Sequence, residues 1–140
     1  MENKNVTIVV HSGDFDKIMS AFIIGNGFLS MGFQVTLFFT FWGLLALKTN
    51  GFKKAPLSRM NMFGLGRFMI KKKVRKYNVA SLDELALNFI KLEGKIIACT
   101  MTMELMGVKE EDLRTDLVSE FATVGKYCYV TKDADIALFI

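Results

Sequence analysis

A cysteine followed by two threonines is the segment of this sequence that points most directly to chemistry. Cys99 ends the apolar run Lys-Ile-Ile-Ala-Cys, and Thr100, Met101 and Thr102 follow it. A cysteine attacks as its thiolate, which the unpaired amides at the start of a helix stabilise. This position predicts a nucleophilic Cys99, with two threonine hydroxyls beside any anionic group on the sulfur. The alternative is an inert cysteine in the core, a frequent environment for a free thiol.

The second cysteine and the single histidine are weaker candidates. Cys128 follows Tyr127 in an apolar run, which predicts burial in a core strand. A resolving role would require its strand to lie beside that of Cys99. His11 ends another apolar run, and we expect backbone groups to satisfy it. The sequence offers no third group to orient a Cys-His pair.

Two further polar segments follow apolar runs that read as buried strands. Val6–Val10 precedes His-Ser-Gly, and Gln34–Phe39 precedes Thr-Phe-Trp-Gly. In a parallel α/β sheet, ligands bind beyond the carboxyl ends of the strands. If the three strands are neighbours, their ends face one crevice. The anion- or substrate-binding residues expected there, beside Cys99, are Ser12, Gly13, Thr40, Trp42, Thr100, Met101 and Thr102.

The elements that must position these residues alternate between strands and helices. Apolar residues recur at helical spacing from about Asp16 to Met31, and Ser81-Leu-Asp-Glu is a capping box that opens a second helix. Further expectations are a strand at Lys95–Cys99, a short turn or helix at Met101–Met106, a helix start at Lys109–Leu113, and strands at Tyr127–Val130 and Ala137–Ile140. This order predicts an α/β, flavodoxin-like three-layer domain with a mostly parallel sheet.

Length and composition restrict the classes of function. The chain has 140 residues, of which 51% are hydrophobic, so we expect one domain over residues 1–140 with more apolar surface than a monomer buries. Two cysteines and one histidine provide neither a disulfide framework nor a structural zinc site, and we expect no metal. The amino terminus has no secretory signal, which favours the cytoplasm. The uncharged stretch 18–47 changes from helical to strand periodicity, which favours a helix and a strand over a membrane span.

Residues 48–78 form a basic segment rich in methionine and phenylalanine, here called the excursion. No acidic residue occurs between Lys17 and Leu82. Residues Phe68 to Tyr77 could form one or two helical turns, and the rest is expected to be a long loop or lid. Such a segment attracts anions or an acidic partner, and it matches no nucleic-acid-binding module. Its basic residues are Lys48, Lys53, Lys54, Arg59, Arg67, Lys71, Lys72, Lys73, Arg75 and Lys76.

Three segments also carry a family resemblance. They are Val-Val-His-Ser-Gly-Asp-Phe-Asp-Lys (9–17), Gly-Phe-Gln-Val-Thr-Leu-Phe-Phe-Thr-Phe-Trp-Gly-Leu (32–44) and Ile-Ala-Cys-Thr-Met-Thr-Met-Glu-Leu-Met-Gly-Val (97–108). Together they resemble the DsrE/DsrF/DrsH-like sulfur-relay family, most closely its soluble single-domain branch often labelled peroxiredoxin-like. The resemblance implies a homo-oligomeric α/β domain whose Cys99 carries sulfur as a persulfide or thiosulfonate. The family often has serine where this chain has Thr102, which keeps the hydroxyl.

These observations lead us to expect a cytoplasmic sulfurtransferase-like carrier rather than a multiple-turnover enzyme. Its partners would be sulfur-relay carrier proteins and small sulfane-sulfur anions, with no cofactor, no nucleic acid and no integral membrane segment. One alternative is a nucleotide- or flavin-binding module with a structural Cys99, although the sequence lacks a glycine-rich phosphate loop. Another is a scaffold that docks on the inner membrane face through the excursion.

Overall fold

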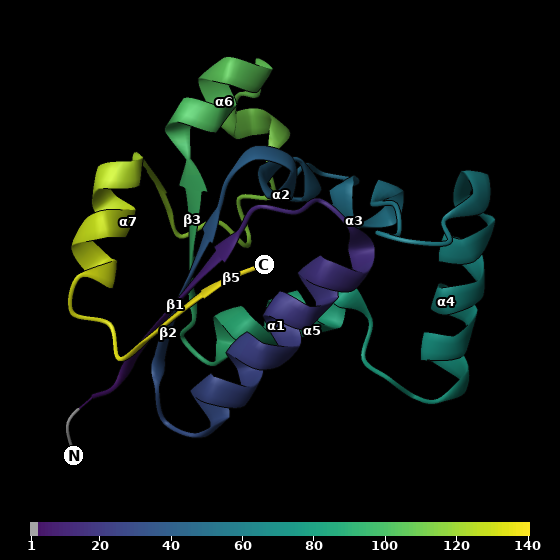
Figure 1. The fold of residues 1–140 in the computed structure, drawn as a ribbon, viewed down its shortest axis with the longest axis horizontal. Coiled ribbons are helices and arrows are strands. Elements are labelled where there is room, and N and C mark those ends of the chain that lie inside the picture. Colours follow the sequence, from purple (N-terminus) through teal and green to yellow (C-terminus); the bar gives the residue numbers. More distant parts are fainter. Residues whose placement is uncertain (1–2) are drawn as a thin grey trace.

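A five-stranded, all-parallel sheet forms the centre of the computed structural model, which describes residues 3–140 (Figure 1). The strand order is β4-β3-β2-β1-β5. The strands are β1 Asn5–Val10, β2 Gln34–Phe39, β3 Lys95–Cys99, β4 Glu120–Ala122 and β5 Ile136–Phe139. The predicted α/β architecture is confirmed. Of the five runs expected to be strands, the first three are the inner strands β1, β2 and β3, and the run at Ala137–Ile140 largely coincides with β5.

Helices cover both faces of this sheet and give the predicted three layers. The α-helices are α1 Phe15–Ser30, α2 Phe41–Ala46, α3 Gly51–Lys54, α4 Leu65–Lys76, α5 Leu82–Lys91, α6 Thr100–Met106 and α7 Val124–Thr131. Two 3-10 turns are η1 Met62–Gly64 and η2 Glu110–Asp112. Helices α1 and α5 pack side by side on one face, and α7 lies on the other (Figure 1). Asn26 Nδ2 donates to the Leu85 carbonyl at 2.9 Å, which joins α1 to α5.

The two faces of the sheet bury different amounts of apolar surface. Under α1 and α5 lies the main core, in which the ring of Phe22 contacts those of Phe39, Phe52 and Phe89 at centroid distances of about 6 Å. The α7 face holds a small cluster of Phe38, Ile97 and Cys99, against which Ala122 and Tyr127 pack. Cys99 therefore belongs to the less extensively covered face.

Two helix-end signals predicted from the sequence are present in the structure. Ser81 Oγ accepts from the Glu84 amide, and the Ser81 amide donates to Glu84 Oε2, so the capping box is complete. Gly32 follows α1 with a φ of 85°, the left-handed conformation that glycine adopts without strain.

Two expectations near the carboxyl terminus are wrong or incomplete. Residues Tyr127–Val130 lie in α7, not in a strand, and the short edge strand Glu120–Ala122 precedes that helix. Strands β4 and β5 are parallel and lie at opposite edges of the sheet, so the chain must cross its face between them, usually as a helix. The aromatic and β-branched composition of 127–130 had favoured a strand. Lys109–Leu113 contains only the 3-10 turn Glu110–Asp112.

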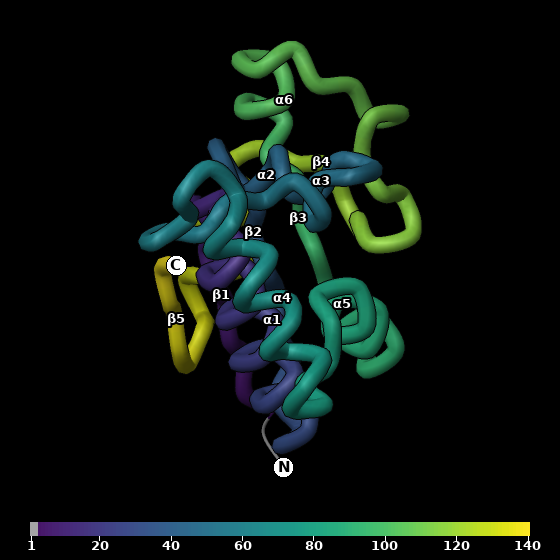
Figure 2. Tube along the Cα trace, turned by 90° about the vertical axis from the view of Figure 1, so that its right-hand side faces the viewer, coloured from purple at the N-terminus to yellow at the C-terminus, as the bar shows by residue number. Residues whose placement is uncertain are grey.

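The excursion is largely helical rather than an open loop. It contains α3, η1 and the 12-residue α4, which is longer than the one or two turns expected at Phe68–Tyr77. Figure 1 shows α4 outside α1, farther from the sheet, and Figure 2 shows it running along the outer surface of that layer. Arg67 Nη1 donates to the Lys54 carbonyl at 2.7 Å, and Lys71 Nζ donates to that of Lys53 at 3.2 Å. Among residues 3–140, no helix has the length and apolarity needed to cross a bilayer.

Candidate functional site

Cys99 lies at the junction of β3 and α6, as the strand-end argument requires. It is the last residue of β3 and the N-cap of α6. Its side chain is only 1% exposed and lies in the cluster with Phe38 and Ile97. Tyr127 of α7 stacks on Phe38 at a centroid distance of 4.9 Å and packs against this cluster. The thiol is therefore buried on the α7 face, and a reagent reaches it only when part of this cover moves.

A pair of buried hydroxyls joins the start of α6 to the end of β2. Thr102 Oγ1 and Thr40 Oγ1 form a hydrogen bond of 3.0 Å, and the Phe41 amide donates to Thr102 Oγ1 at 3.1 Å. Thr102 is fully buried, and Phe41 has a φ of 45°, which is uncommon and strained for a bulky residue. The hydroxyl of Thr102 thus stabilises the strained backbone of Phe41, which follows β2, the strand next to the one that ends at Cys99.

His11 follows β1 at the same end of the sheet. Its amide donates to the Ile140 carbonyl at 2.8 Å, and its carbonyl accepts from the Gly43 amide at 2.9 Å. Its ring stacks between Phe41 and Phe139, with centroids at 5.2 and 5.5 Å. The backbone of His11 is hydrogen-bonded and its ring packs against aromatic side chains, and no carboxylate of residues 3–140 is hydrogen-bonded to the imidazole.

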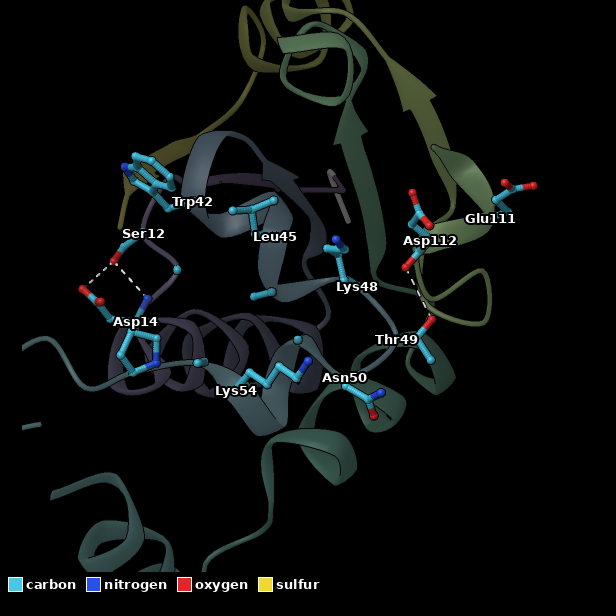
Figure 3. A pocket seen from close by; sticks show the side chains of 15 residues that line it. Ser12, Asp14, Trp42, Leu45, Lys48, Thr49, Asn50, Lys54, Glu111 and Asp112 are labelled. Atoms are coloured by element: carbon cyan, nitrogen blue, oxygen red, sulfur yellow. Dashed lines mark hydrogen bonds between the residues drawn. The ribbon is translucent and has the colours of Figure 1, made fainter. Parts of the chain in front are cut away.

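Three of the expected binding residues line a separate cavity. Ser12, Gly13 and Trp42 belong to the wall of a cavity of about 650 Å³ (Figure 3). Ser12 Oγ donates to Asp14 Oδ2 at 2.9 Å and accepts from the Asp14 amide at 3.3 Å. The other polar or charged residues of the wall are Asp14, Lys48, Thr49, Asn50, Lys54, Glu111 and Asp112.

The single crevice expected from the strand ends is therefore divided. Thr40, Cys99 and Thr102 are buried together at the β2 and β3 ends, and none of them lines this cavity. Thr100 is half-buried and Met101 is exposed, and neither lines it either. The division arises because α2 packs in backbone contact with the loop after β1. A Cβ atom on Gly43 would lie 2.1 Å from the Val10 carbonyl oxygen, and one on Gly13 would lie 2.6 Å from that of Trp42.

Cys128 does not occupy the core position that the sequence suggested. It lies on α7 and is exposed, and both cysteines are free thiols. The prediction failed for the same reason as the predicted strand, because burial was inferred from the apolar run in which Cys128 follows Tyr127. In residues 3–140, no three histidine, cysteine, aspartate or glutamate side chains come together as metal ligands.

Two residues that shape the site were not singled out from the sequence. Tyr127 covers the Cys99 cluster from α7, and Phe41 carries the strained backbone bonded to Thr102. Neither has a local signal, because an aromatic side chain gives no indication of positive φ or of the face it will cover.

Several charged groups tie the excursion and its neighbours to the body. Burial raises the pKa of Asp16, but hydrogen bonds from the side chain and amide of Ser58 outweigh it and leave that pKa below its usual value. Burial and the nearby Arg67 lower the pKa of Lys71, whose ammonium lies over the ring of Phe15.

Large apolar side chains remain exposed near the carboxyl end of the sheet. They come from α2, from α6, from the start of α7 and from the end of β5, all elements that meet at this end (Figure 1). Exposed apolar side chains that gather at one end of a fold make that end a candidate interaction surface. These residues are Trp42, Met101, Leu105, Val124 and Phe139.

Comparisons with known proteins extend over the whole fold. The family model described as DsrE/DsrF/DrsH-like matches residues 2–55 and 49–139. The uncharacterized protein YrkE of Bacillus subtilis is 37% identical, over 99% of this chain and 98% of its own length. The sulfur carrier protein DsrE2 of Allochromatium vinosum is 27% identical over the full length of both chains.

Solved structures share the fold at low sequence identity. The ychN protein of E. coli superposes with a TM-score of 0.62 at 12% identity, over 98% of this chain and 99% of its own. MTH1491 of Methanobacterium thermoautotrophicum, titled a protein of unknown function, gives 0.59 at 9% identity, over 97% and 99%. At these identities the likeness concerns the fold alone.

Proposed function

This chain belongs to the DsrE/DsrF/DrsH-like family, and on that basis we propose that it is a sulfur carrier that holds sulfur on Cys99 and passes it to a protein partner. The observation that supports this most directly is the position of Cys99 at the carboxyl end of an inner parallel strand, where α/β proteins bind their ligands. A relative that matches the full chain is named a sulfur carrier protein.

The proposed reaction exchanges one sulfur–sulfur bond for another. The Cys99 thiolate attacks the outer sulfur of a donor persulfide, a new S–S bond forms, and the donor leaves as its thiolate. A thiolate of the acceptor protein then attacks the outer sulfur and releases Cys99 as a thiolate. The thiolate is the attacking species at both steps, and no net oxidant or reductant is consumed.

The burial of Cys99 gives this carrier a protected resting state. A persulfide under Tyr127 would be shielded from water and from competing thiols, which is a useful property for a relay. Transfer then requires movement of α7 or α6, and we propose that partner docking causes it. We propose that Thr40 and Thr102 position the α6 start during this movement, with the amides of Thr100 and Met101 facing the terminal sulfur.

The partners would bind over the exposed apolar side chains at this end of the sheet. Met101 lies on α6, which begins at the Cys99 junction, and Trp42 lies on α2, which follows the neighbouring strand β2. A second copy of the chain or a sulfur-relay carrier protein would cover them, because either offers a complementary apolar surface. The homo-oligomer implied by the resemblance therefore stays part of this proposal.

A second candidate function is suggested by the separate cavity. Its volume is of the size that small ligands occupy, and Trp42, Lys48 and Lys54 could stack on and neutralise an anionic ligand. A nucleotide released on denaturation of the purified protein would support this candidate and would leave Cys99 as a structural thiol.

Intact-mass spectrometry tests the carrier chemistry. Reduced protein would be treated with polysulfide or tetrathionate, and Cys99→Ser would be compared with Cys128→Ser. In Cys128→Ser the remaining cysteine is Cys99, and we expect this variant to take up sulfur that reductant removes. Cys99→Ser retains the exposed Cys128 and therefore measures unspecific reaction of an accessible thiol. The absence of an adduct in Cys128→Ser would refute the proposal.

A further inference from the structure

The excursion presents a group of large apolar side chains to solvent at the amino-terminal end of α4. We call this group the apolar tip. Each of its members is more than half exposed, and Phe63 is fully exposed. Single exposed apolar side chains are common on folded proteins, whereas a group of them marks a binding region. The tip consists of Met60, Met62, Phe63, Leu65, Phe68 and Met69.

The fold holds the tip outward, because a different face of α4 attaches the helix to the body. Val74 packs on the main core, and the side chains of Arg67 and Lys71 donate to carbonyls of the α3 segment. Met60, Met62 and Phe63 all have φ angles between 43° and 57°. Such left-handed angles are unfavourable for bulky side chains, and all three of these strained residues are exposed.

Positive charge continues from the tip along α4. Lys72, Lys73, Arg75 and Lys76 are exposed. In the described part of the chain, none of these four forms an ion pair. The stretch that contains them has no acidic residue from Ile18 to Ser81. These cations are therefore available to a partner that carries many negative charges.

We propose that the apolar tip and α4 dock on the surface of an anionic lipid bilayer. Amphipathic segments bind there by burying apolar side chains at the headgroup boundary while their lysines and arginines attract anionic lipids. The 12 residues of α4 extend about 18 Å, against a hydrocarbon core of about 30 Å, so the element lies on the surface.

The position of α4 suits such docking. It is the outermost element on the α1 side of the sheet, whereas α7 and the Cys99 cluster lie on the opposite side (Figures 1 and 2). A bilayer that contacts α4 would leave the α7 face free for a protein partner. The inference goes beyond the carrier function and does not depend on the reactivity of Cys99.

Vesicle flotation with the full chain tests this docking. The vesicles would contain phosphatidylcholine alone or phosphatidylcholine with phosphatidylglycerol, at low and high salt. We expect flotation with the anionic vesicles at low salt and its loss at high salt, because salt screens exposed charges. Replacing three cations near such a surface weakens partitioning by about 100-fold. We expect that effect for the triple variant K72Q/K73Q/K76Q.

Matched variants distinguish binding through the excursion from binding through the net charge or apolar surface of the whole protein. The triple variant K4Q/K91Q/K95Q removes the same charge from exposed positions outside the excursion, and we expect it to float as the unaltered protein does. F63S/F68S should lose flotation, whereas M31S/L87S, which alters exposed residues elsewhere, should keep it. C99S should float normally, so failure of the carrier chemistry would not affect this result.

Three outcomes would overturn the proposal. They are the absence of flotation with anionic vesicles, an equal loss in the control variants, and an oligomer of the unaltered protein that dissociates in F63S/F68S. The last outcome would mean that a second copy covers the tip.

Discussion

Replacing Thr102 with valine should destabilise the domain by about 2–4 kcal/mol, although the two side chains have nearly the same shape. The Thr102 hydroxyl is fully buried and bonds both the Thr40 hydroxyl and the Phe41 amide. Thr102→Val leaves those two groups without a partner. A buried unpaired polar group costs about 1–3 kcal/mol, and the Phe41 amide lies at the lower end of this range because it is only partly buried. Urea unfolding followed by circular dichroism measures the loss. With a total stability of about 5–15 kcal/mol, the variant should still fold.

Two further variants test whether the lost hydrogen bonds are the cause. Thr102→Ser keeps the hydroxyl, and it should cost less than about 1.5 kcal/mol because only a methyl group is removed. Thr40→Val combined with Thr102→Val leaves only the Phe41 amide unpaired, so the double variant should lose less stability than the sum of the single variants. The reasoning is refuted if Thr102→Val is as stable as the unaltered protein, or if Thr102→Ser is as unstable as Thr102→Val.

Two other predictions concern the thiols and the attachment of the excursion. Iodoacetamide should alkylate exposed Cys128 rapidly and buried Cys99 slowly in the native chain. Mass spectrometry of Cys128→Ser measures the alkylation of Cys99 with and without denaturant. Equal rates of Cys99 alkylation in the two conditions would contradict the observed burial. Ser58→Ala should remove up to about 1 kcal/mol at neutral pH. Because bonding to Ser58 keeps the folded pKa of Asp16 low, that contribution is present above the unfolded pKa and disappears as the pH falls through the folded pKa. Urea midpoints of the two proteins should therefore converge in acid, and a constant difference would exclude this contact as the cause.

The sheet and its first helices follow from local sequence patterns. Continuous apolar runs at 6–10, 34–39 and 95–99 identify strands buried on both faces, and the observed inner strands match them. The capping box at Ser81 marks its helix because the two hydrogen bonds form between residues three apart. Local chemistry was sufficient in these cases because each signal is satisfied within one element.

The carboxyl-terminal quarter shows where local patterns fail. Residues 127–130 have the composition of a strand, yet they form α7 because the chain must cross the sheet between its two edges. The edge strand Glu120–Ala122 is only three residues long and carries a glutamate, so it has no strand-like run to detect. For residues 127–130, the need to connect two opposite sheet edges therefore outweighs the strand propensity of the side chains.

The sequence by itself determined the α/β class, the placement of Cys99 at a strand end and the concentration of positive charge in residues 48–78. Only the tertiary structure decided that the thiol is buried beside Tyr127, that Ser12 and Trp42 line a different cavity, and that Cys128 is exposed. It also decided that the apolar residues of the excursion face solvent. The end of a strand and a run of charges are both set by residues adjacent in the sequence, so they can be recognised from it. Burial depends on which distant segments cover a side chain, and no local spacing encodes that.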